Sequence, residues 1–171
     1  MVVLSEGRVL QVGTPQEVFN RPRNTEVARI VGIETAIAGR VRETVEGLAA
    51  VEVDGVMLHA LAEDDVGPDV FVCVRAEDVV LGQGGTGTTS ARNQLRGRVV
   101  DITSMGALVK VGLDCGFPLS AVVTRSAVED LHLSPGTPVT ASMKAGAVHL
   151  VPRRDADGLR NAMQGENRSL R

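Results

Sequence analysis

The stretch LRGRVVDITSMGALVKVGLD, residues 95–114, decides the fold class of this chain. Its β-branched residues and its alternation of apolar with polar positions are typical of half-buried β-strands and not of a helix. The stretch holds two predicted strands, LRGRVVDITS and GALVKVGLD. Three further runs of this kind follow: FPLSAVVT, TPVTASMKA and AVHLVP. The spacing of Ala127, Val128 and Leu131 predicts one short helix among them. Five short strands with a single helix match a small closed barrel of OB type.

A similar series of strands precedes this stretch. The runs are AIAGRVRETV, LAAVEV, VMLHAL and VFVCVRAEDVVL, and turn signals separate them at Glu46-Gly47, Asp54-Gly55 and Gly67-Pro68. The sequence therefore predicts an all-β chain built from two similar OB-like barrels.

The N-terminal residues follow a different pattern. Two short strands surround the turn Ser5-Glu6-Gly7, and Thr14-Pro15-Gln16-Glu17 is a capping box with proline at the first helical position. We expect a short helix there, then a second helix that is capped by Thr25 and stopped at Gly32. This small α/β unit has too little apolar surface to fold alone.

The predicted organisation has five parts. They are a short α/β unit (1–34), a first OB-like half (35–82), a linker of small residues (83–89), a second OB-like half (90–152) and a polar, disordered tail (153–171).

The composition excludes several classes of partner. The formal net charge is -3, and the chain has 3 Phe but no Trp or Tyr, so it lacks the basic groove and the stacking aromatics of nucleic-acid binders. Cys73 and Cys115 stand apart without a CxxC partner, which favours buried thiols in a reducing compartment. No run approaches the roughly 18 apolar residues of a membrane span. We expect a cytoplasmic protein that binds no nucleic acid and inserts no segment into a membrane.

No catalytic constellation stands out. Gly82 and Gly87 have the spacing of a phosphate-binding loop, but Thr88 stands where that motif needs a Lys, and a strand follows instead of a helix. The patterns G-x-S-x-G and HExxH are absent from the sequence. We expect no ATP site, no metal-ion site and no enzymatic activity in this chain by itself.

Hydrogen-bond donors gather where the predicted strands of the second half end. They lie from Ser90 to Asn93, from Thr124 to Ser126 and from Lys144 to Gly146. Hydroxyls, Arg, Lys and backbone N–H groups without carboxylates are what a divalent tetrahedral oxyanion requires. The alternative is that Arg92 and Lys144 are solvated surface charges and that Thr124 and Ser126 cap the short helix. Residue types alone favour this alternative.

Residues 90–151 closely resemble the molybdate-binding Mop (molbindin) domain. The shared features, in the family order, are the opening S-A-R-N-Q, the step Gly106-Ala107, the segment Val-Thr-Arg-Ser and a closing Lys-Ala followed by V-H-L. The resemblance implies an oxyanion held between two subdomains, often across a subunit interface. It implicates Ser90 and Arg92 together with Lys144 and Ala145, and less directly Thr124 and Ser126. Some members have Ser after the Lys, whereas Ala145 offers only its backbone N–H.

Two other segments resemble the ATP-binding subunit of an ABC importer. Residues 1–34 are similar to the end of its nucleotide-binding domain. VRAEDVVL, residues 74–81, is similar to the R-P-E-D segment of its regulatory TOBE domain, with Ala76 in place of Pro. The phosphate-binding loop, the signature motif and the catalytic carboxylate of that family are absent from this sequence. We therefore expect the regulatory region of a molybdate/tungstate importer subunit without its ATPase core.

The resemblance implies a sensor of molybdate or tungstate in the cytoplasm. The bound oxyanion would join two regulatory domains into a homodimer and hold the attached ATPase domains in an inhibited arrangement. In the parent protein those ATPase domains would contact the ABC permease subunits at the inner membrane. Two alternatives stay open: a stand-alone oxyanion store like the small molbindins, and a structural dimerisation module without a ligand.

Overall fold

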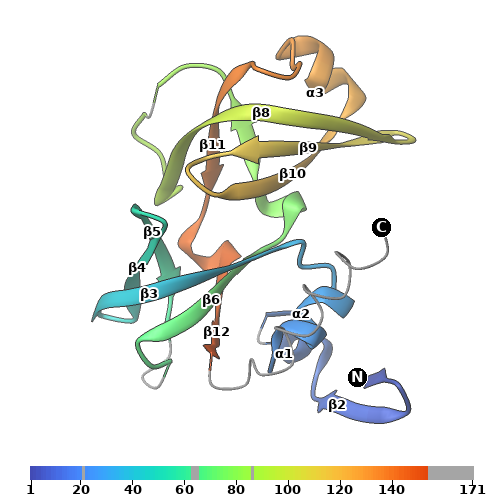
Figure 1. The fold of residues 1–171 in the computed structure, drawn as a ribbon, viewed down its shortest axis with the longest axis vertical. Coiled ribbons are helices and arrows are strands. Elements are labelled where there is room, and N and C mark those ends of the chain that lie inside the picture. Colours follow the sequence, from blue (N-terminus) through green and yellow to red (C-terminus); the bar gives the residue numbers. More distant parts are fainter. Residues whose placement is uncertain (21, 63–65, 86, 154–171) are drawn as a thin grey trace, which may run out of the picture.

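The computed structural model describes residues 1–20, 22–62, 66–85 and 87–153. The tail for which the sequence predicts disorder lies outside the described residues, apart from residue 153. The fold is built on two five-stranded antiparallel sheets, each curled into a half-barrel (Figure 1). The predicted all-β fold class with two OB-like units is confirmed.

Ten strands form the two sheets. In chain order they are β3 (Thr35–Val45), β4 (Leu48–Val53), β5 (Val56–Leu61), β6 (Asp69–Val74), β7 (Val80–Gly82), β8 (Asn93–Met105), β9 (Leu108–Asp114), β10 (Pro118–Thr124), β11 (Pro138–Met143) and β12 (Val148–Pro152). The predicted helix α3 (Arg125–Asp130) lies between β10 and β11. The first sheet has the order β12-β6-β3-β4-β5, and the second has the order β10-β9-β8-β11-β7.

Each sheet is completed by a strand from the other half of the chain. β7 pairs with β11 of the second sheet, and β12 pairs with β6 of the first sheet. A turn of 3-10 helix precedes each exchanged strand, η1 (Ala76–Asp78) before β7 and η2 (Ala145–Ala147) before β12. Sheet pairing therefore crosses between the segments 35–82 and 90–152, whose bounds stay a prediction.

The run VFVCVRAEDVVL, residues 70–81, is divided into two strands, β6 and β7. β6 ends at Val74, and η1 redirects the chain before β7 begins at Val80. The turn is closed by a hydrogen bond from Asp78 N–H to Arg75 O at 3.1 Å. Apolar residues continue through the break because Ala76 and Val79 are buried, so the sequence pattern does not reveal it.

The two halves repeat the same architecture. β3 and β8 each carry a β-bulge, between Val41 and Glu43 and between Val99 and Asp101. A glycine stands two residues ahead of each bulge, and an added Cβ at Gly97 would meet Cys115 Sγ at 2.6 Å. The strands β3–β7 are called the first repeat and the strands β8–β12 the second repeat.

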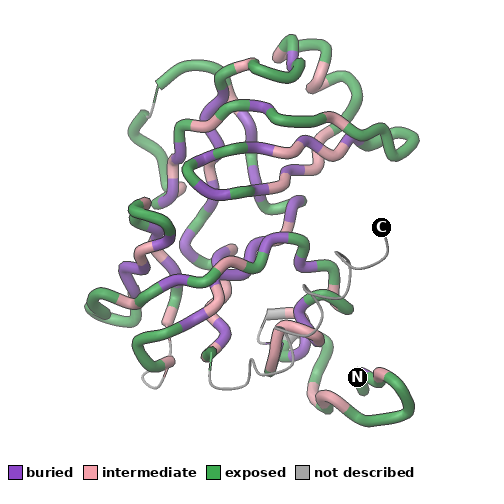
Figure 2. The backbone as a smooth tube through the Cα atoms, in the orientation of Figure 1, coloured by how far each residue is buried: buried purple, intermediate pink, exposed green. Residues whose placement is uncertain are grey.

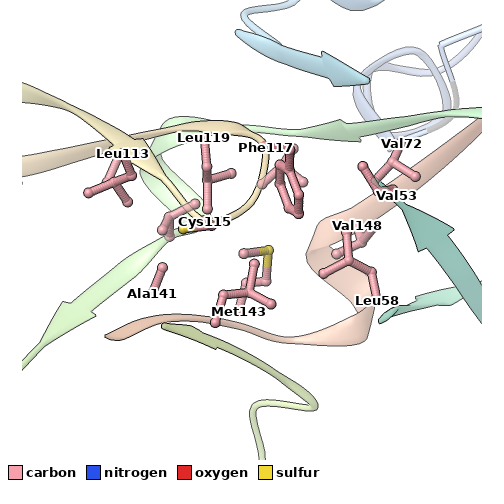
Figure 3. Packing of buried hydrophobic residues seen from close by; sticks show 14 of the residues in the cluster. Val53, Leu58, Val72, Leu113, Cys115, Phe117, Leu119, Ala141, Met143 and Val148 are labelled. Atoms are coloured by element: carbon pink, nitrogen blue, oxygen red, sulfur yellow. The ribbon is translucent and has the colours of Figure 1, made fainter. Parts of the chain in front are cut away.

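One apolar core joins the two sheets. Val72 and Val148 of the first sheet belong to the same buried cluster as Leu119 and Met143 of the second sheet (Figure 3). These side chains are at most 2% exposed, so the repeats share their interior and do not pack as independent barrels. The tip of the β8–β9 hairpin stays exposed (Figure 2).

The N-terminal segment forms a hairpin and two short helices beside the first sheet (Figure 1). The hairpin is β1 (Val2–Ser5) with β2 (Arg8–Val12), and the helices are α1 (Pro15–Asn20) and α2 (Thr25–Ile30). The capping box of α1 is confirmed, because Thr14 N–H donates to Glu17 Oε2 at 2.7 Å and Glu17 N–H donates to Thr14 Oγ1 at 3.2 Å.

The start of α2 differs from the expectation by one residue. Asn24 and not Thr25 is the cap, since Asn24 Oδ1 accepts a hydrogen bond from Val27 N–H at 2.9 Å. The helix ends as predicted at Gly32, whose φ of +87° favours glycine.

Candidate functional site

Arg92 and Lys144 are the residues next to the last pair of β8 and β11, at one end of the second sheet. β8 and β11 pair as far as Asn93 and Met143, so the next step of the register places Arg92 beside Lys144. Both residues are exposed, and neither side chain forms an ion pair or a hydrogen bond with the described part of the chain. Like charges at adjacent strand ends repel each other, so an anion bound between them would be stabilised by both.

Gln94 fixes the loop that carries Ser90 and Arg92. Its side-chain amide accepts a hydrogen bond from Gly87 N–H at 2.9 Å and donates one to Gly87 O at 2.8 Å. Ser90 is exposed within this closed loop, two residues ahead of Arg92. The hydroxyl of Ser90 and the guanidinium of Arg92 are therefore held at the same end of β8.

Asn93 is a structural residue and not a free donor. It is 2% exposed, its Oδ1 accepts from His59 N–H at 2.7 Å, and its Nδ2 donates to His59 O at 2.8 Å. These bonds attach the start of β8 to β5, the edge strand of the first sheet. In the segment from Ser90 to Asn93, the side chains of Ser90 and Arg92 are thus the ones left to bind a ligand.

Lys144 and Ala145 stand at the start of η2, where the chain passes from the second sheet to the first (Figure 1). Lys144 has an extended backbone, with φ -72° and ψ 153°, and its carbonyl accepts a hydrogen bond from Ala147 N–H at 3.0 Å. Ala145 is 8% exposed, so its methyl group packs inward. The Lys144 ammonium is the group that this turn offers to an anion.

Thr124 and Ser126 lie at the other end of the second sheet. Thr124 pairs with Leu108 at the tip of the β8–β9 hairpin. β8 has 13 residues, so roughly 40 Å of strand separates its two ends. Thr124 Oγ1 caps α3 by accepting from Ala127 N–H at 3.2 Å, and Ser126 Oγ lies 3.0 Å from Thr124 Oγ1. Within one chain these hydroxyls are not brought to Arg92 and Lys144, and they act as the helix cap and its neighbour.

Apart from the position of Arg92 and Lys144, the titratable side chains of the described residues form no further candidate binding site. No group of three or more His, Cys, Asp or Glu residues there could hold a metal ion. Burial raises the pKa of the Cys73 thiol to about 12, and burial with a contribution from Asp114 raises that of Cys115 to about 11. Among the same residues, no helix has the length and apolar character needed to cross a bilayer.

Sequence reasoning missed the two residues that hold the donor loop. The residue types place Asn93 among the ligand donors and give Gln94 no role. The available signal was strand alternation, because Asn93 precedes Leu95 by two residues and shares its buried face. An amide on the buried face of a strand needs partners inside the protein.

Comparison with known proteins relates this chain to transport ATPase subunits. Residues 89–150 match the protein-family description "TOBE domain". The chain is 35% identical over 151 residues to the molybdate/tungstate import ATP-binding protein WtpC of Pyrococcus horikoshii, covering 88% of this chain and 41% of that protein. It is 29% identical over 137 residues to the sulfate/thiosulfate import ATP-binding protein CysA of Thermosynechococcus vestitus, covering 79% of this chain and 34% of that protein. The chain thus spans less than half the length of these relatives.

A solved structure shares the fold. The cytoplasmic molybdate-binding protein ModG, crystallised with molybdate bound, superimposes with a TM-score of 0.61 at 29% sequence identity. The match covers 70% of this chain and 97% of that chain.

Proposed function

Residues 89–150 belong to the TOBE domain family and the chain is homologous to the C-terminal region of molybdate/tungstate import ATP-binding proteins, and from this premise we propose that it binds molybdate or tungstate. The ligand would lie at the end of the second sheet, held by Ser90, Arg92, Lys144 and the backbone N–H of Ala145.

The observation that carries this proposal is the juxtaposition of Arg92 and Lys144 without a carboxylate partner in the described residues. Side-chain rotamers let two exposed cations move apart. Gln94 fixes the loop and Asn93 fixes the strand end, which limits how far the backbone beneath Arg92 can move. A fixed pair of donors binds a tetrahedral oxyanion with less ordering cost than a mobile pair.

The ion would stabilise the folded chain as well as neutralise the cations. A ligand that binds the native state and not the unfolded state adds RT ln(1 + [L]/Kd) to stability, about 2.7 kcal/mol at one hundred times Kd. We expect molybdate to raise the unfolding midpoint of the chain by an amount that grows with the logarithm of [L]/Kd.

Isothermal titration of the chain with molybdate, tungstate and sulfate tests the proposal. Lys144→Ala and Arg92→Ala should each weaken molybdate binding at least about ten-fold, because a hydrogen bond to a charged group contributes ~1.5–3 kcal/mol. Lys110→Ala and Arg96→Ala are matched controls: Lys110 pairs with Glu34 at 3.0 Å, and Arg96 is exposed on β8. Unchanged affinity in Lys144→Ala would refute the site.

Sulfate is part of the titration because one relative is a sulfate/thiosulfate import protein. Sulfate is smaller than molybdate, so a site shaped for the larger ion holds it with longer and weaker hydrogen bonds. Sulfate binding as tight as molybdate binding would reassign the ligand while leaving the site in place.

The proposed regulation is dimerisation by the ion. Thr124 and Ser126 are too far along the sheet to reach the ligand of their own chain, so any role for them requires a second chain. The solution mass should therefore rise from monomer to dimer on addition of molybdate, and Ser126→Ala should weaken that response while α3 keeps its Thr124 cap. A dimer whose mass and stability ignore molybdate would contradict the sensor role.

A stand-alone oxyanion store would give a different result in the same experiments. A stand-alone store forms its oligomer without the ion and binds several ions per assembly, whereas the sensor binds the ion and then pairs. The likeness to nearly the whole length of ModG keeps this second candidate in the comparison. A structural module without a ligand would give no heat with any of the three anions.

The wider setting of the proposal comes from the relatives. A parent protein with an ATPase domain ahead of this region would work with permease subunits at the cytoplasmic face of the membrane, and the described region would regulate it and not hydrolyse ATP. Reconstituted transport that slows as internal molybdate rises, and that no longer slows in Lys144→Ala, is the expected behaviour.

A further inference from the structure

The first repeat has its own counterpart of the Arg92–Lys144 position. The matching bulges and ladder registers equate Asn93 with Thr35, because Asn93 pairs with Met143 as Thr35 pairs with Val74. One residue beyond these pairs, Lys144 corresponds to Arg75. The same step equates Arg92 with Glu34.

The equivalence extends to the bonds around this position. Thr35 Oγ1 accepts from Ser120 N–H at 3.3 Å on β10, as Asn93 Oδ1 accepts from His59 N–H on β5. The turns η1 and η2 begin directly after Arg75 and Lys144. The two positions are therefore the same place in two copies of one architecture.

The first copy does not suit an oxyanion. Glu34 replaces Arg92, and its carboxylate forms an ion pair with Lys110 Nζ at 3.0 Å. A carboxylate at this place repels a divalent anion, and the nearby ammonium is already neutralised by it.

Arg75 binds the N-terminal segment instead. Its Nη2 donates to Phe19 O at 2.5 Å, and its guanidinium carbon lies 5.2 Å from the centre of the Phe19 ring. Phe19 is in the last turn of α1, where carbonyl groups lack helical partners and a cation is favoured. The guanidinium thus donates a hydrogen bond to a carbonyl group at the end of α1 and also lies over the Phe19 ring.

This contact ties α1 to the barrels. Val18, a buried residue of α1, packs with Val3 and Val27 inside the N-terminal unit itself. α2 instead reaches the first sheet directly, where Ala28 clusters with Cys73 and Val151. Arg75 follows the strand β6 that carries Cys73, so it extends the same docking surface to α1.

We propose that the first-repeat counterpart of the oxyanion position anchors the N-terminal segment through Arg75 and Phe19, and that the chain consequently has a single oxyanion position. The anchor is inferred from the contacts between Arg75 and Phe19 and does not depend on the proposed function. The count of one ion per chain rests in addition on the proposed function.

Hydrogen exchange measured on the full chain tests the anchor. Arg75→Met keeps an unbranched apolar side chain and removes both the hydrogen bond and the cation. The Val18 amide, which donates to Thr14 O inside α1, should then exchange at least about ten-fold faster as α1 opens locally. Arg40→Met, on an exposed position of β3, is the control and should leave that rate unchanged. Equal rates in Arg75→Met and the wild-type chain would overturn the anchor.

Titration with molybdate tests the count. The wild-type chain should bind one ion per chain, and Arg75→Met should bind it with an affinity within about two-fold of the wild type, because the two positions share no partner. Two ions per chain, or a large loss of affinity in Arg75→Met, would overturn the single position. A chain that binds no molybdate at all would refute the proposed function and the count with it, while the exchange result would still decide the anchor.

Discussion

Replacing Asn93 by alanine should destabilise the chain more than any other single change at the junction of the repeats. The side chain makes two short hydrogen bonds, at 2.7 and 2.8 Å, to the N–H and the carbonyl of His59. Each bond contributes about 1 kcal/mol net, and a backbone group left buried without a partner costs about 1–3 kcal/mol. Because Asn93 is 2% exposed, water reaches the vacated space poorly. The expected loss of unfolding free energy is roughly 2–4 kcal/mol.

The pseudo-symmetric residue provides the control. Thr35 makes the corresponding contact with a single bond of 3.3 Å, so Thr35→Val should cost about 1 kcal/mol or less. Urea unfolding followed by far-ultraviolet circular dichroism is the suitable assay, since the chain has neither Trp nor Tyr for fluorescence. An Asn93→Ala variant that loses no more stability than Thr35→Val would refute the reasoning from the paired hydrogen bonds.

Three further predictions concern packing, titration and capping. Gly97→Ala should lower the unfolding free energy by about 1–3 kcal/mol through its clash with Cys115 Sγ at 2.6 Å, while Gly85→Ala, with open space around its Cβ, should be nearly neutral in the same urea titration. In the folded chain the pKa of Cys73 is raised from 9.0 to about 12 and that of Cys115 from 9.0 to about 11. The unfolding free energy that these thiols contribute should therefore be fully present below pH 9. It should fall as the pH rises from there toward 11, by ~1.4 kcal/mol per pH unit for each thiol. Cys73→Ala should reduce that slope, and an unchanged slope would contradict the assignment. Asn24→Ala removes the cap bond of 2.9 Å and should speed hydrogen exchange in α2, with a cost of about 0.5–2 kcal/mol, leaving the exchange of β8 amides as the internal reference.

The strands were predictable because their chemistry is local. Alternation, β-branched residues and the turns Glu46-Gly47 and Asp54-Gly55 are enough to place them, and Glu46 and Asp54 do adopt the positive φ that such turns require. The exchange of β7 and β12 was not predictable in this way. A strand carries the same pattern whichever sheet it joins, so nothing in Val80 to Gly82 distinguishes β11 from β6 as its partner.

The candidate site shows the same division between local and distant information. The family resemblance implicates Arg92 and Lys144, but their proximity depends on a register between strands separated by more than 30 residues of chain, from Met105 to Pro138. The roles of Asn93 and Arg75 depend on partners in other elements, His59 and Phe19. Such partners follow from the fold and not from the neighbouring sequence.

The exchanged strands also set an order of events during synthesis. The edge of β6 that will receive β12 leaves the ribosome about 80 residues before β12 does, a delay of roughly 4–16 s at ordinary elongation rates. For that time an apolar strand has an open edge, which is the condition under which chains pair wrongly with each other. The β12-side edge of β6 therefore stays without its native partner until residue 152 emerges. Synonymous changes that slow translation between residues 90 and 148 should lower the soluble yield without altering the finished protein.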